Sequence, residues 1–203
     1  MADELIVVGG GAAGMMAAIS AAETGAAVRL LERNPKVGRK LYITGKGRCN
    51  VTNHCPPEEV LASTPRNGRF LYGAVTRTPP AWVEDFFTGL GVPLKVERGN
   101  RVFPVSDHSS DVIAALAREM QRLKVKVQLH CEVKELLINN EKEIKGVRLA
   151  NGKKMTADAV VVATGGISYP STGSTGDGYC FARNCGHKVT ELFPSLVPME
   201  VKE

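Results

Sequence analysis

Residues 5–14 read LIVVGGGAAG, a short apolar run that turns directly into a glycine-rich segment. Four branched apolar residues in succession are typical of a parallel strand that is buried on both faces. Good helix formers follow from Met15 to Thr24, and Gly25 stands where a helix end favours a left-handed residue. A second apolar run at residues 26–31 completes the pattern. The sequence therefore predicts a βαβ unit with a right-handed crossover, and an α/β fold class.

The glycine-rich segment carries a G-x-G-x-x-G pattern at Gly9, Gly11 and Gly14, and Glu32 ends the second predicted strand. In this context Gly9 permits a tight turn, Gly11 lets the backbone approach a pyrophosphate, and Gly14 lets the helix pack closely on the strand. The amide groups at the helix N-terminus attract phosphate, and the Glu32 carboxylate can accept hydrogen bonds from a ribose. A dinucleotide site is favoured over a purely structural glycine turn.

Glu32 also restricts which dinucleotide can bind. Its charge repels a ribose phosphate, which disfavours NADP although Arg33 is the next residue. NAD and FAD remain. An NAD domain usually continues with alternating strands and short helices, whereas residues 34–53 form a long segment of Gly, Lys, Arg, Thr and Asn without apolar periodicity. A long loop of this kind inside a compact domain is usually functional.

That loop contains TGKGRCNVTN at residues 44–53. The stretch resembles the SGGGRCNxTN element of the BaiN-like, or aminoacetone-oxidase-like, FAD-binding flavoproteins, which are NAD(P)/FAD-dependent oxidoreductases. Lys46 departs from the glycine that is usual there. The resemblance continues through ATGG at residues 163–166, YPSTGSTGDG at 169–178 and PSLVP at 194–198, so that it covers essentially the whole chain. It implies a Rossmann-like FAD-binding fold with a parallel sheet and a small β-meander, lacking the family's C-terminal part.

The glycine fingerprint and the resemblance together predict a set of residues that bind FAD. The turn at residues 9–14 would hold the pyrophosphate, the residues ending the second strand the adenosine, and the RCN loop the flavin or its phosphates. Val133 would read the adenine edge through its backbone, and the segment after residue 163 would return to the dinucleotide. The predicted cofactor-binding residues are Gly9, Gly11, Ala13, Gly14, Glu32, Arg33, Arg39, Lys40, Gly47, Arg48, Cys49, Asn50, Val133, Thr164 and Gly165.

No catalytic residue is predicted. Arg48 is a candidate for stabilising the negative charge of a reduced flavin, and a phosphate clamp or a loop salt bridge is an equally good interpretation. Cys49 suggests a redox thiol, but no partner cysteine lies at CxxC spacing, so a buried, inert thiol is favoured. The four histidines are scattered, and no metal site is predicted. Residues 171–178 are interpreted as a connecting loop rather than an anion-binding nest.

The remaining segments predict further elements. A helix is expected from Thr78 to a stop at Gly91, with an apolar core face. A β-hairpin is expected over residues 95–103, and another helix is expected to be capped by Ser109 or Ser110. The core face of the helix expected between Thr78 and Gly91 would comprise Trp82, Val83, Phe86, Phe87 and Leu90. Later elements would be a β-meander at about 126–157, a parallel strand at 159–163, a helix at 177–185 and a strand at 197–201.

Composition bounds the location and partners of the protein. The chain has 203 residues, a formal charge of +5, 43% hydrophobic residues and five cysteines. An odd cysteine count without CxxC agrees with a reducing compartment, and no apolar run approaches the ~20 residues that span a bilayer. An acidic N-terminus argues against a signal peptide, so a cytoplasmic location without membrane association is expected. The basic residues concentrate between positions 33 and 48 beside glycines, which favours a local anion site over a nucleic-acid surface.

These observations predict an FAD-binding oxidoreductase that passes hydride or electrons between NAD(P)H and an unidentified small organic substrate. Two alternatives stay open: a non-catalytic dinucleotide-binding fragment and, less favoured, an RNA-associated flavoprotein. Residues 1–193 are expected to form the incomplete FAD-binding domain, and residues 194–203 to begin a second domain.

Overall fold

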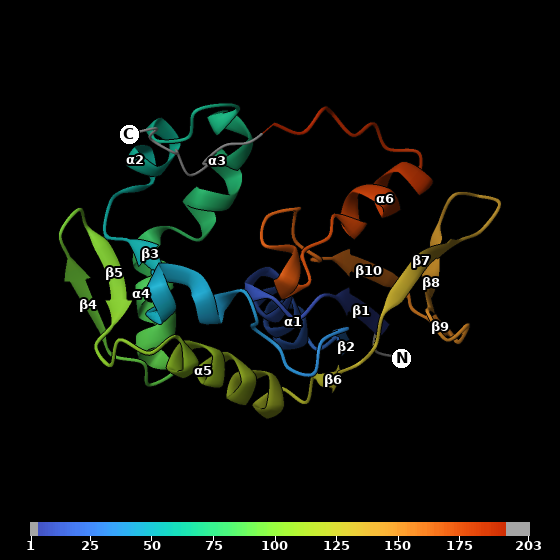
Figure 1. The fold of residues 1–203 in the computed structure, drawn as a ribbon, viewed down its shortest axis with the longest axis horizontal. Helices are drawn as coiled ribbons and strands as arrows, with labels where there is room; N and C mark the ends of the chain where they lie inside the picture. Colours follow the sequence, from blue (N-terminus) through green and yellow to red (C-terminus); the bar gives the residue numbers. More distant parts are fainter. Residues whose placement is uncertain (1–3, 194–203) are drawn as a thin grey trace, which may run out of the picture.

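A parallel sheet of four strands lies at the centre of the computed structural model, which describes residues 4–193 (Figure 1). The strand order is β10-β1-β2-β6, with β1 at Glu4–Val8, β2 at Ala27–Leu31, β6 at Lys126–Gln128 and β10 at Ala159–Val162. Helix α1 (Ala12–Glu23) connects β1 to β2, which confirms the predicted βαβ unit. The return of β10 to the sheet, parallel to β1, is also confirmed.

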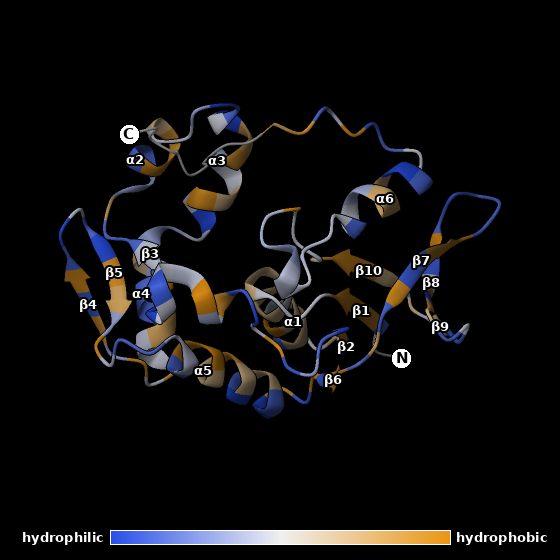
Figure 2. Cartoon of the chain, viewed as in Figure 1, coloured by the Kyte–Doolittle hydropathy of each residue, from blue (hydrophilic) through white to orange (hydrophobic). Residues whose placement is uncertain are grey.

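Each face of this sheet has its own hydrophobic core. Val7 and Leu30 point to one face and pack with residues of α1 and of helix α5 (Ser109–Arg122). Ile6 and Val8 point to the other face, where they meet Phe181 of helix α6 (Asp177–Asn184) and an antiparallel meander. Burial on both faces explains why β1 is apolar without alternation. Figure 2 shows the same feature, since β10 and most of β1 are coloured as hydrophobic.

The meander comprises β7 (Val133–Ile138), β8 (Ile144–Leu149) and β9 (Lys154–Thr156). Its predicted start near residue 126 is wrong, because residues 126–128 are β6 and pair with β2 in the parallel sheet. All three residues of β6 are exposed at the sheet edge. A short exposed strand lacks the apolar run by which the other parallel strands were predicted.

A second antiparallel sheet lies at the far end of the molecule, with the order β3-β5-β4. Its strands are β3 (Thr52–Asn53), β4 (Leu94–Glu97) and β5 (Arg101–Pro104), and the predicted hairpin is confirmed with Gly99 and Asn100 in its left-handed turn. Helix α4 (Pro80–Gly89) follows its prediction, except that Trp82 is 39% exposed rather than in the core. Trp82 stacks on Phe86, with the two ring centroids 5.2 Å apart.

Several elements differ from the sequence-based expectations. Helices α2 (Pro57–Ala62) and α3 (Gly68–Arg77) were not predicted. His108, and not Ser109 or Ser110, is the N-cap of α5, because Ser109 is already helical and its hydroxyl donates to the carbonyl of Tyr42. The loop after β2 contains a 3₁₀ segment at Leu41–Gly47, and a second lies at Pro170–Thr172. The strand expected at residues 197–201 and the proposed second domain lie outside the described residues.

Candidate functional site

A cavity of about 520 Å³ lies at the carboxyl ends of β1, β2 and β10. In doubly wound α/β folds, ligands bind at this edge of the sheet. The walls come from the β1–α1 turn, the segments that follow β2 and β10, and the start of β7. Of the predicted cofactor-binding residues, the cavity is lined by Gly9, Gly11, Ala13, Glu32, Arg33, Arg39, Lys40, Val133, Thr164 and Gly165.

The three fingerprint glycines occupy different environments. A Cβ on Gly14 would fall far inside contact distance of the Gly9 carbonyl oxygen, so Gly14 is needed where α1 meets the turn. Gly9 has φ +108°, and a Cβ there would lie 2.5 Å from the carbonyl oxygen of Ala163. A Cβ on Gly11 would meet no atom within 4 Å. Gly9 and Gly14 thus allow close packing of the turn and α1 against neighbouring backbone, whereas Gly11 leaves space on the cavity side.

The N-terminus of α1 offers donors without acceptors. Gly11 is its N-cap and provides no side-chain cap. Within residues 4–193, the amides of residues 11–14 have no hydrogen-bond partner, as is usual for the first turn of a helix. Together with the helix dipole, these amides form a site for an anionic group.

Glu32 is buried beside this turn. One carboxylate oxygen accepts a hydrogen bond from the Gly10 amide at 2.6 Å, and the other accepts from the amide and side chain of Asn34 at 2.7 and 2.6 Å. Glu32 therefore fixes the β1–α1 turn against the end of β2, in addition to lining the cavity. Asn34 was not predicted as a site residue, although its position two residues after Glu32 suits it for this local hydrogen bond.

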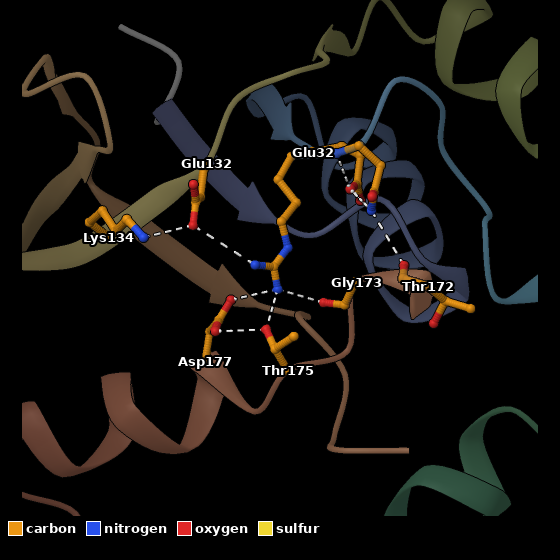
Figure 3. A network of polar contacts seen from close by, with 9 residues as sticks. Glu32, Glu132, Lys134, Thr172, Gly173, Thr175 and Asp177 are labelled. Atoms are coloured by element: carbon orange, nitrogen blue, oxygen red, sulfur yellow. Dashed lines mark hydrogen bonds and ion pairs between the residues drawn. The ribbon is translucent and has the colours of Figure 1, made fainter. Parts of the chain in front are cut away.

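The three basic side chains that line the cavity are engaged by the protein itself. Arg33 donates to the Gly173 carbonyl at 2.6 Å, Arg39 to the Asn34 side chain at 2.6 Å, and Lys40 to the Ser168 carbonyl at 2.7 Å. The guanidinium of Arg33 also contacts Thr175, Asp177 and Glu132, and Figure 3 shows dashed lines from it to these residues and to Gly173. Sequence reasoning did not predict that residues 172–177 form a wall of the cavity.

The structure places the predicted residues Gly47, Arg48, Cys49 and Asn50 outside the cavity wall. Leu41 and Thr44, earlier in the same loop, do line the cavity. With its side-chain nitrogen assigned to face them, the Asn50 amide donates to the carbonyls of Thr52 and Val102 at 2.9 and 3.1 Å, which ties the loop to the β3-β5-β4 sheet. The thiol of Cys49 is buried, and burial raises its pKa, so the thiolate needed for redox chemistry is disfavoured.

Arg48 belongs to an ion-pair network on that sheet. Its guanidinium lies 4.2 Å above the ring of Phe103, pairs with Glu97, and is 2.6 Å from Asp107. Lys95 is 2.7 Å from Asp107. Hydrogen bonds from the two cations hold the pKa values of Glu97 and Asp107 below their ordinary range and raise those of Arg48 and Lys95. This geometry matches the loop salt bridge that the sequence left open for Arg48.

The lowered carboxylate pKa values predict acid sensitivity. Groups with a depressed folded-state pKa stabilise the fold above about pH 4, and that contribution is lost as the pH falls through the folded-state values. We therefore expect Asp107→Asn to show a smaller difference in unfolding free energy between pH 7 and pH 3 than the wild type. Urea titrations at the two pH values measure it. Asp85→Asn is the control, since Asp85 is exposed and forms no ion pair with any described residue; equal behaviour of the two variants would contradict the prediction.

Residues 4–193 contain neither a metal-binding cluster nor a helix that could span a membrane. No group of three or more His, Cys, Asp or Glu side chains is arranged to hold a metal ion in that range. None of its helices combines the length and the apolar character that crossing a membrane requires.

The hydroxyl oxygen of Thr164, at the cavity edge, is buried and finds no hydrogen-bond partner in the described part of the chain.

Comparisons with known proteins identify related sequences and solved structures of the same fold. The chain is 36% identical over 203 residues to a 3-dehydro-bile acid delta(4,6)-reductase of Clostridium scindens, covering 97% of this chain and 47% of that protein. It is 29% identical over 202 residues to a ribosomal RNA dihydrouridine synthase of Haemophilus influenzae, covering 98% and 49%. A flavocytochrome c3 fumarate reductase in its open conformation has the same fold, with a TM-score of 0.67, 20% identity, and coverage of 91% and 40%.

The chain thus spans about half the length of the curated relatives that it matches. The family model of the HI0933-like protein Rossmann domain matches residues 3–193, which include every element described above. The protein belongs to this HI0933-like family of FAD-binding Rossmann proteins.

Proposed function

We propose that this chain binds FAD, with the pyrophosphate at the N-terminus of α1 and the adenosine ribose beside Glu32. The observation that carries the proposal is the set of unpartnered amides at residues 11–13, which belong to residues that line a cavity next to a buried carboxylate. A volume of about 520 Å³ lies within the usual range of ~300–1,000 Å³ for small-molecule sites. The unpartnered hydroxyl of Thr164 is a further polar group with unused hydrogen-bonding capacity at this edge.

The residues present suit a dinucleotide without a ribose phosphate. Glu32 repels a 2′-phosphate, and the guanidinium of Arg33, which could have bound one, already contacts protein acceptors. Val133 lines the cavity, and its backbone would read the adenine edge. At the other end, the loop leading from Leu41 to Asn50 would approach the flavin. Bound FAD would supply the hydride and electron chemistry that no side chain provides.

The corresponding enzyme would be a flavin-dependent oxidoreductase that acts on a small organic molecule in the cytoplasm, with NAD(P)H as the diffusible donor. The role of this chain would be to hold and orient the cofactor. Arg48, within that loop, has its charge offset by Glu97 and Asp107. We propose that Gly47, Arg48, Cys49 and Asn50 shape the flavin end through this fixed loop.

The cofactor proposal predicts the colour of the protein. We expect the purified chain, either as isolated or after addition of FAD, to show the flavin absorption bands and to release FAD on denaturation. Absorption spectroscopy, followed by chromatography of the released cofactor, tests this. FMN serves as the control ligand, because it lacks the adenosine that Glu32 would hold. A colourless protein that takes up neither flavin would contradict the proposal.

An RNA substrate is a second candidate, supported by the net charge of +5 and by the relative named as a ribosomal RNA dihydrouridine synthase. Against it, four basic side chains between positions 33 and 48 are engaged by protein acceptors, which leaves less charge for phosphates; they are Arg33, Arg39, Lys40 and Arg48. Binding of ribosomal RNA fragments that weakens steeply with salt would favour this candidate.

A further inference from the structure

The segment after β10 forms a wall of the cavity. Thr172, Gly173, Ser174 and Asp177 all line it, and the last of these begins α6. The segment contains left-handed backbone at Tyr169, Gly173 and Gly176, with φ values of 54°, 100° and 84°. Such a chain makes few repeating hydrogen bonds of its own, so its position depends on contacts with neighbouring segments.

These contacts come from the residues that follow β2. Among the described residues, every hydrogen bond between residues 168–177 and the chain outside 164–193 is donated by one of three side chains: Arg33, Asn34 or Lys40. Arg33 makes the largest contribution, because one of its terminal nitrogens reaches the Gly173 carbonyl, the Thr175 hydroxyl and the Asp177 carboxylate. The Asn34 contact with the Thr172 carbonyl is longer, at 3.4 Å.

The residues around Arg33 allow its contact with residues 172–177. A Cβ on Gly173 would lie 2.7 Å from the side-chain nitrogen of Asn34, so glycine lets the two segments approach. The charge of Arg33 is balanced by Asp177 at 2.9 Å and by Glu132 at 3.9 Å. Figure 3 shows Gly173, Thr175 and Asp177 joined to the guanidinium by dashed lines. Its donors are therefore directed at the wall.

We propose that Arg33 is a positioning residue, which holds residues 172–177 and the start of α6 against the end of β2 and thereby shapes the adenosine end of the cavity. Arg33 acts on a ligand through this wall. For its effect on the cofactor, this inference rests on the proposed FAD function. Its effect on the wall does not, since the contacts are made between segments of the protein itself.

The test is hydrogen exchange of the FAD-free 203-residue chain, combined with FAD release rates. In Arg33→Ala we expect amides of residues 165–180 to exchange about tenfold faster than in the wild type, with the parallel sheet unchanged, and FAD to dissociate about tenfold faster. Thr175→Val removes one acceptor while keeping Arg33, and should accelerate exchange in the same segment by a smaller factor. Arg148→Ala is the matched control, because it removes the partner of Glu135 in the meander, away from the cavity.

Each outcome bears on the proposal. Exchange that is accelerated only in residues 165–180, in both variants but not in the control, supports it. Unchanged exchange in that segment with faster FAD release in Arg33→Ala overturns it, because Arg33 would then contact the cofactor directly. Acceleration over the whole chain also overturns it. If the wild type binds no FAD, the proposed function fails, and the exchange experiment still decides the role of Arg33.

Discussion

Gly14→Ala is expected to destabilise the protein by about 3 kcal/mol or more, a large part of the ~5–15 kcal/mol that stabilises a typical domain. The added Cβ would overlap the carbonyl oxygen of Gly9 and would also lie 3.4 Å from the Cβ of Ala163. Both obstacles belong to backbone or to a short side chain, so neither can rotate away. Relief requires α1 to move from the sheet, and Met15 and Ile19, which are fully buried, would lose their packing.

Urea unfolding followed by circular dichroism measures this effect. Gly73→Ala is the matched control, because Gly73 lies inside α3 and a Cβ there meets no atom within 4 Å. Alanine is the better helix former, so the control is expected to gain up to ~1 kcal/mol. A Gly14→Ala variant with the stability of the wild type would show that α1 does not pack on the turn as described.

The sequence predicted the parts of the fold that depend on local patterns. The β1–α1–β2 unit follows from an apolar run, three glycines and a helix-forming stretch that are adjacent in the chain. Glu32 lies at the end of β2 as expected, whereas its contact with a ribose stays a prediction. The hairpin turn at Gly99 and Asn100 is equally local.

Contacts between distant segments could not be predicted in the same way. The acceptors of Arg33 at Gly173 and Thr175 are 140 and 142 residues away along the chain, so no local spacing indicates them. Strand β6 is short and exposed, and its assignment to the parallel sheet depends on pairing with β2. Helix α3 was missed as well, and the aromatic side chains of its residues Phe70 and Tyr72 are exposed, so they do not mark a core face.

Gly11→Ala is expected to weaken FAD binding about 100-fold, or ~2.7 kcal/mol, while the chain without cofactor stays folded. Gly11 has φ −80° and ψ −174°, an extended conformation that alanine adopts freely, and the new Cβ meets no protein atom within 4 Å. The fold therefore loses no more than about 1 kcal/mol, from the poorer N-cap. The methyl group enters the space through which a pyrophosphate would approach the amides of α1.

Quenching of flavin fluorescence on titration with the protein measures the affinity, and urea unfolding of the FAD-free variant measures the stability. Gly73→Ala again serves as control, since it adds the same methyl group far from the cavity lining and should bind FAD as the wild type does. The contrast with Gly14→Ala is informative, because the two substitutions in one fingerprint should impair different properties. Gly11→Ala should weaken cofactor binding, whereas Gly14→Ala should destabilise the fold. Equal affinity of Gly11→Ala and the wild type would place the pyrophosphate elsewhere than on α1.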